Sequence, residues 1–142
     1  MTAKTEKAIQ IEKKNWNYTS LTFWLSWLFA IGLIALGTNG LIQPNAASQA
    51  FGIGITESAA SGFVMVKAVR DLALGLTIAL FAFVKMKKSL MMLAFVSSII
   101  PFMDGILVIT QRGEVIYSLQ HFITAIVVLI TAFLLWREDK NA

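Results

Sequence analysis

Three ionisable residues stand within five positions of an otherwise apolar stretch, "VKAVRDLALGL" (66–76): Lys67, Arg70 and Asp71. On a helix they share one face, because positions i, i+3 and i+4 lie above one another. A basic group near the centre of a bilayer costs about 2.5–3.5 kcal/mol on insertion scales, so this face must meet the protein interior or water. Asp71 can pair with Lys67 one turn away, and Arg70 then needs an acidic partner on another helix.

Polar residues in two other apolar stretches add the remaining chemistry. Asp104 is the one acid of "SLMMLAFVSSIIPFMDGILVIT" (89–110), and His121 lies in "IYSLQHFITAIVVLITAFLLW" (116–136). A carboxylate with an imidazole is the minimum for proton transfer, so Asp104 and His121 are the candidate catalytic acid/base pair for an isomerisation or cyclisation. Arg70 would anchor an anionic or carbonyl oxygen, which its planar guanidinium suits. The candidate ligand-binding residues are Arg70, Asp71, Lys67, Asn39, Phe51 and Tyr117.

The same residues also have a purely structural interpretation. Ion pairs between the two cations and the two carboxylates would fix helix register, which buried pairs can do without adding net stability. The chain would then be a non-enzymatic accessory subunit or a homo-oligomer of the membrane. A metal site is a further alternative, but two adjacent cations disfavour it, so we expect no metal and no cofactor; its ligands would be His121, Asp71, Asp104 and Glu57. The sequence leaves open whether the protein is an enzyme.

Four apolar blocks must position these residues. The chain has 142 residues, 57% hydrophobic and 14% charged, whereas a soluble domain carries about 25% charged residues. Each block exceeds the roughly 18–20 residues that cross a bilayer. We therefore predict an all-α integral membrane protein, an antiparallel four-helix bundle, with spans over about 19–42, 62–85, 89–110 and 116–136. Small residues on one face of the first span predict close helix packing there: Ser26, Ala30, Gly37 and Gly40.

Basic residues cluster on one side of the predicted membrane. They precede the first span, fill the turn between the second and third, and follow the fourth, whereas the 43–61 connection has none. By the positive-inside rule both termini are cytoplasmic, and the partner is a lipid bilayer rather than nucleic acid. In a bacterium this would be the cytoplasmic membrane.

The predicted organisation is a basic N-terminal tail (1–18), a transmembrane domain (19–137) and a C-terminal tail (138–142). The lack of cysteine excludes disulfide and thiol chemistry.

Depth along the predicted helices brings the polar residues into one layer. Counted from the outer helix ends at about 1.5 Å per residue, they lie roughly 5–14 Å below the outer boundary. The 43–61 connection lies above this layer. Pro44 ends the first helix, and a short amphipathic segment that carries Phe51 can form a lid that excludes water. Pro101 predicts a kink in the third span, because proline removes a backbone hydrogen bond. This arrangement suits a small lipophilic ligand that enters from the outer leaflet.

The segments "LIQPNAASQAFGI" and "VKAVRDLALGL", followed by Asp104-Gly105 and the single His121, resemble a family of small four-helix membrane proteins. This family is catalogued as a domain of unknown function (number 4267) and is broadly similar in design to DoxX-like membrane proteins. The resemblance covers about residues 20–136, and its most specific part is Arg70-Asp71-Leu72 with Gly75. It implies a four-helix fold with a shared polar site, and no particular activity.

Overall fold

The computed structural model describes residue 16 and residues 18–55, 58–112 and 115–140. Within these ranges the chain is helical and contains no strand. The helices are α2 (Leu21–Ile42), α3 (Pro44–Phe51), α4 (Ser58–Phe83), α5 (Lys87–Ser97), α6 (Ile99–Arg112) and α7 (Val115–Lys140). The predicted all-helical class is confirmed. Apart from Trp16 and Tyr18, the predicted basic tail (1–18) lies outside the described residues.

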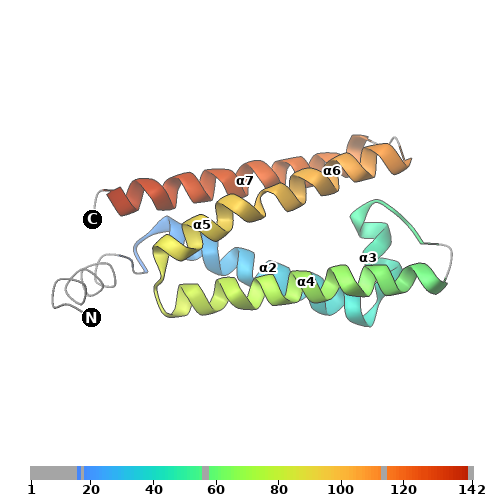
Figure 1. Cartoon of the computed structure of the whole chain (residues 1–142), viewed down its shortest axis with the longest axis horizontal. Coiled ribbons are helices and arrows are strands. Elements are labelled where there is room, and N and C mark those ends of the chain that lie inside the picture. Colours follow the sequence, from blue (N-terminus) through green and yellow to red (C-terminus); the bar gives the residue numbers. More distant parts are fainter. Residues whose placement is uncertain (1–15, 17, 56–57, 113–114, 141–142) are drawn as a thin grey trace.

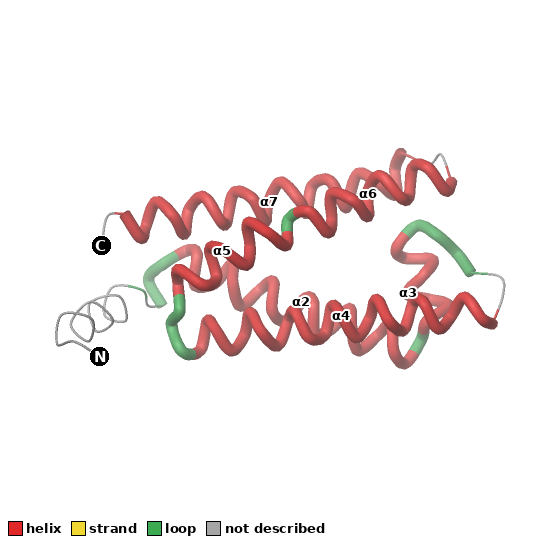
Figure 2. The backbone as a smooth tube through the Cα atoms, viewed as in Figure 1, coloured by secondary structure: helices red, strands yellow, loops and turns green. Residues whose placement is uncertain are grey.

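The long helices lie side by side in two pairs (Figure 1). α2 packs against α4, and the consecutive helices α5 and α6 together pack along α7. The short turn after α4 joins the two pairs at one end, and α5 and α6 diverge from α4 beyond this turn (Figure 2). α4 and α5 are joined by this turn, but the main partner of α4 is α2.

Small residues explain why α2 and α4 pair so closely. A Cβ atom added at Gly37 would lie 2.7 Å from the backbone oxygen of Ala68, and one at Gly75 would lie 2.9 Å from that of Ala30. Only a residue without a side chain allows two helix backbones to approach this far. The predicted small-residue face is confirmed, because its four members on α2 are all buried.

The third predicted span is divided at Ser98, where α5 ends and α6 begins. Pro101 lies in the first turn of α6 and has no N–H to donate to the carbonyl group of Ser97. The predicted kink is therefore present, as a break between two helices. The two pieces still form one continuous apolar run over Lys87–Gln111.

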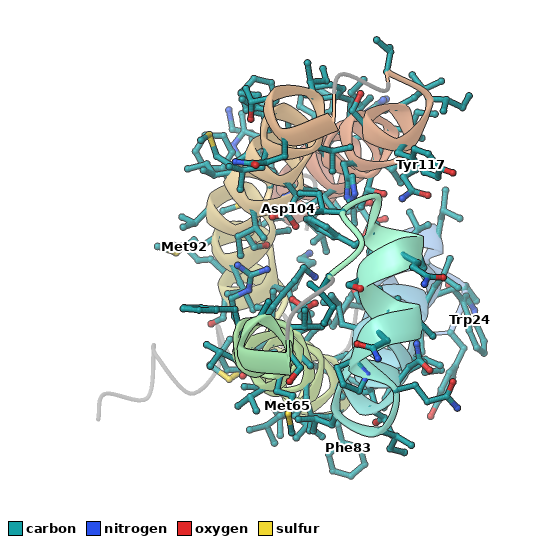
Figure 3. All side chains as sticks on the ribbon, turned by 90° about the vertical axis from the view of Figure 1, so that its right-hand side faces the viewer. Trp24, Met65, Phe83, Met92, Asp104 and Tyr117 are labelled. Atoms are coloured by element: carbon teal, nitrogen blue, oxygen red, sulfur yellow. The ribbon has the colours of Figure 1, made fainter. Side chains whose placement is uncertain are left out.

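Among the described residues, three helical segments are long and apolar enough to cross a membrane: Leu21–Ile42, Lys87–Gln111 and Val115–Lys140. Only 17% to 28% of their most apolar stretches is buried inside the protein, so most of these side chains face outward. Figure 3 shows Trp24, Phe83 and Met92 pointing away from the helices' centre. An apolar exterior of this extent indicates an integral membrane protein. α4 has sufficient length, but its three ionisable residues set it apart from these segments.

A polar clasp ties the beginning of α2 to the end of α7. The hydroxyl groups of Ser20 and Thr22 donate to the carboxylate of Glu138 at 2.9 and 2.7 Å. The indole N–H of the buried Trp16 donates to the Thr22 hydroxyl at 2.8 Å. Helix α7 continues through Lys140, and the predicted boundary of the C-terminal tail at residue 138 stays a prediction.

The close α2–α4 contact predicts that Gly37→Ala is strongly destabilising, although alanine is a better helix former than glycine. The added methyl group would meet backbone atoms that cannot move aside. We expect the variant to lose about 1–3 kcal/mol of stability, as overpacked helix contacts do. Gly32→Ala on the same helix is the matched control, because a Cβ there meets nothing within 4 Å. Thermal unfolding in detergent, followed by tryptophan fluorescence, measures both. Equal melting temperatures would contradict the proposed packing.

Candidate functional site

A cavity of about 670 Å³ lies among the helices and is lined by residues from every one of them. Most of its wall is apolar. The polar lining residues gather toward the end covered by α3, and they include Asn39, Lys67, Asp71, Asp104, Gln120 and His121. In the end-on view of Figure 3, Asp104 points into the space between the helices.

An ion network on α4 forms the centre of this polar end. Lys67 Nζ lies 2.5 Å from Asp71 Oδ2, and Arg70 Nη2 lies 3.3 Å from Asp71 Oδ1. The same guanidinium nitrogen lies 3.9 Å from Asp104 Oδ2 on α6. Both ion pairs expected from the sequence are therefore present. Asp71 is the most enclosed member, with 7% of its side chain exposed, and it is shared by both cations.

Helix α3 covers the polar end, in the connection that the sequence predicted to hold a short amphipathic segment. Pro44 occupies the first helical position, where the missing N–H costs nothing. Gly52 ends the helix with φ 101°, a left-handed conformation that glycine adopts without strain. The N–H groups of Gly52 and Ile53 cap the carbonyl groups of Gln49 and Ser48 at 3.0 and 3.1 Å.

Side chains of α7 hold the end of α3 in place. Gln120 Nε2 donates to the carbonyl oxygen of Ala50 at 3.0 Å, and His121 Nε2 lies 2.9 Å from that of Phe51. Because a carbonyl oxygen only accepts, the His121 proton is on Nε2. The Phe51 ring lies 4.7 Å from the imidazole and 5.0 Å from Lys67 Nζ, measured to the ring centroids. Phe51 thus bridges α4 and α7 above the ion network.

The Asp104 carboxylate, unlike that of Asp71, accepts no hydrogen bond from the described part of the chain. It lines the cavity, 15% of its side chain is exposed, and its one polar contact within the described chain is the distant Arg70 guanidinium. Asp104 and His121 line the same cavity, but no hydrogen bond joins them among the described residues. The acid/base pair therefore stays a prediction.

The other candidate residues divide into two groups. Asn39 lines the cavity together with Lys67 and Asp71, whereas Arg70 is not among the lining residues and keeps 44% of its side chain exposed. Tyr117 is not among the lining residues; it packs beside the α3 cap, where a Cβ on Gly52 would lie 2.8 Å from its own Cβ. Glu57 lies outside the described residues, and the described part of the chain holds no cluster of three or more metal-ligating residues.

Sequence reasoning missed Gln120 as a site residue. Its partner is a backbone carbonyl group, which no side-chain pattern reveals. The available signal was its place beside His121 on the same helix turn.

A family model described as a domain of unknown function (DUF4267) matches residues 30–135. The chain belongs to this family. The matched range contains α3 and every charged residue of the cavity, whereas Ser20, Thr22 and Glu138 of the polar clasp lie outside it. Comparisons with curated proteins and with solved structures give no match.

In this DUF4267 member the two cavity carboxylates should differ sharply in their effect on stability. Asp71→Asn would leave Lys67 and Arg70 without their shared counter-charge, and we expect a loss of about 1–3 kcal/mol. Asp104→Asn makes the same chemical change where no hydrogen bond is lost, so its melting temperature should stay near that of the wild type. Thermal unfolding of the ligand-free proteins in detergent compares them. Equal losses for the two variants would show that Asp104 is as structural as Asp71.

Proposed function

We propose that this protein binds a small lipophilic molecule inside the membrane, with the polar part of that molecule beneath α3. The cavity volume of about 670 Å³ lies within the roughly 300–1,000 Å³ of small-molecule sites. Such sites combine an apolar wall with a few convergent polar groups, as this one does. The observation that carries the proposal is the Asp104 carboxylate, which faces the cavity without a hydrogen bond.

The proposal includes four membrane crossings, α4 being the fourth. The N-cap residue of α2, Ser20, is hydrogen-bonded to Glu138 near the end of α7. Three crossings would leave these two residues on opposite sides of the membrane, so their contact supports a further crossing by α4. Lys67 and Asp71 line the cavity, and the partly exposed Arg70 is paired with Asp71, which lowers the cost of placing these charges in the membrane.

The proposed orientation has both termini in the cytoplasm. The turn between α4 and α5 and the end of α7 carry lysines and arginine, and they lie at the same end of the protein, where Lys87 is 3.9 Å from Asp139. A basic end is retained on the cytoplasmic side. α3 and the polar end of the cavity would then face the outer leaflet.

This orientation predicts opposite labelling of two single-cysteine variants, which are simple to prepare because the natural chain has no cysteine. Gln49→Cys on α3 and Lys140→Cys at the end of α7 both replace exposed residues. We expect a membrane-impermeant maleimide to label Gln49→Cys in intact cells and Lys140→Cys only after permeabilisation. The reverse pattern would invert the proposed orientation. Labelling of both variants in intact cells would place α3 and the end of α7 on the same side of the membrane, which contradicts the three crossings proposed between them.

A structural role is the second candidate. Within the described chain, no buried side-chain nitrogen or oxygen lacks a hydrogen-bond partner, and Asp71 is fully occupied by two cations. Under this alternative the network fixes helix register in an accessory subunit or a homo-oligomer.

Acid/base catalysis would go beyond binding, and it would require Asp104 and His121 to act together on a bound molecule.

Native mass spectrometry of the protein purified from membranes separates these candidates. We expect the wild type to carry a small-molecule adduct that Arg70→Gln and Asp104→Asn lose while they remain folded, because Asp104 lines the polar end of the cavity and Arg70 is the cation that neighbours both cavity carboxylates. Asp139→Asn, the same change at the opposite end of the protein, is the control and should keep the adduct. An adduct retained by Asp104→Asn would contradict the proposed site. Absence of any adduct, with both cavity variants dissociating or melting early, would favour the structural role.

A further inference from the structure

The charges at the polar end of the cavity nearly cancel. Lys67 and Arg70 supply two positive charges, and Asp71 and Asp104 supply two negative ones. A carboxylate headgroup would lie beside Asp104, and an ammonium headgroup would lie beside the two cations. Either ligand would bring like charges together where water is scarce, which lowers affinity. An uncharged headgroup avoids both penalties.

The hydrogen-bonding capacity of the side chains at this end narrows the choice of headgroup further. The Asp104 carboxylate accepts hydrogen bonds and has no donor among the described residues, so the ligand should offer a donor there. Lys67 lines the cavity and has three hydrogens on Nζ, one of which is used toward Asp71, so it can donate to the ligand. His121 uses Nε2 toward the carbonyl oxygen of Phe51, and Nδ1 is its other polar atom. A group that both donates and accepts at several points is a cluster of hydroxyls.

The rest of the cavity has the length and character of an alkyl chain site. On α7 its wall extends from Gln120 to Leu135, which at about 1.5 Å per residue is roughly 22 Å. This length exceeds the about 15 Å that one leaflet contributes to a 30 Å hydrocarbon core, so the wall is long enough for the alkyl chain of a lipid. The hydroxyl groups in this part donate to carbonyl groups of their own helices, so they do not require a polar ligand; they include those of Ser26, Ser97, Thr124 and Thr131.

Resting on the proposed function, we infer that the ligand is a single-chain lipid with an uncharged, polyhydroxylated headgroup. The headgroup lies between Lys67 and Asp104 beneath α3. The alkyl chain runs along the apolar wall toward Leu90 and Leu135.

Three probes with the same chain length test the headgroup: monopalmitoylglycerol, palmitate and hexadecylamine. Binding to the full-length protein in nanodiscs is measured by competition with a radiolabelled monopalmitoylglycerol and by the shift in melting temperature. We expect monopalmitoylglycerol to bind about tenfold tighter than either charged probe. Asp104→Asn should lower its affinity by about tenfold, as loss of one hydrogen bond to a charged group predicts. Asp139→Asn should not change it.

A second pair of variants tests the position of the alkyl chain. Val128→Trp would fill the cavity midway along α7, whereas Ile126→Trp adds the same bulk on the exposed side of that helix. We expect Val128→Trp to abolish binding of every probe and Ile126→Trp to preserve it, with helix content unchanged in both.

The outcomes separate this inference from the proposed function. If palmitate or hexadecylamine binds as tightly as monopalmitoylglycerol, or more tightly, and Val128→Trp still blocks binding, the cavity binds lipophilic molecules and the headgroup assignment is wrong. If no probe binds the wild type, or Val128→Trp leaves binding intact, the proposed function is wrong as well.

Discussion

The orientation of helix α4 depends on Asp71, which is paired with both Lys67 and Arg70. Asp71 is buried and Lys67 lines the cavity beside it, so the face of α4 that carries them points inward, while 44% of the Arg70 side chain stays exposed. Gly75 lies one turn after Asp71, and there α4 and α2 come into backbone contact. Arg70 then reaches Asp104 of α6, which joins the two helix pairs at the end where α3 lies. The helix pairing, the cavity between the pairs and its covered polar end all follow from this single charged face.

The two ends of the cavity differ in how completely the protein satisfies its own polar groups. At the end near the turn between α4 and α5, hydroxyl groups occupy the Glu138 carboxylate and Lys87 lies near Asp139. At the α3 end, Asp71 is saturated but Asp104 is not. One end is therefore held closed by its own hydrogen bonds, and the other keeps an acceptor directed into the cavity. This asymmetry is the physical basis for assigning a direction to a bound amphiphile.

Much of this arrangement could be predicted from the sequence, because it depends on spacing. The i, i+4 relation of Lys67 and Asp71, the helix boundary at Pro44 and the break near Pro101 are local effects of chain geometry. The helix pairing was less predictable, since short connections do not determine which neighbours pack most closely. Partners that are backbone carbonyl groups left no signal, which is why Gln120 was missed.

The position of the Lys67–Asp71 pair within one helix also bears on how the chain enters the membrane during synthesis. A single segment with three charges partitions poorly into lipid, whereas its neighbours partition readily. Because Asp71 meets Lys67 one turn away, part of the charge is neutralised as soon as α4 is helical, before α6 and α7 have been synthesised. Arg70 still lacks Asp104 at that stage, since α6 is translated later. We therefore expect α2 and α4 to insert together as a hairpin. Arg70 then gains Asp104 as an acidic partner only when the hairpin of α5, α6 and α7 inserts afterwards.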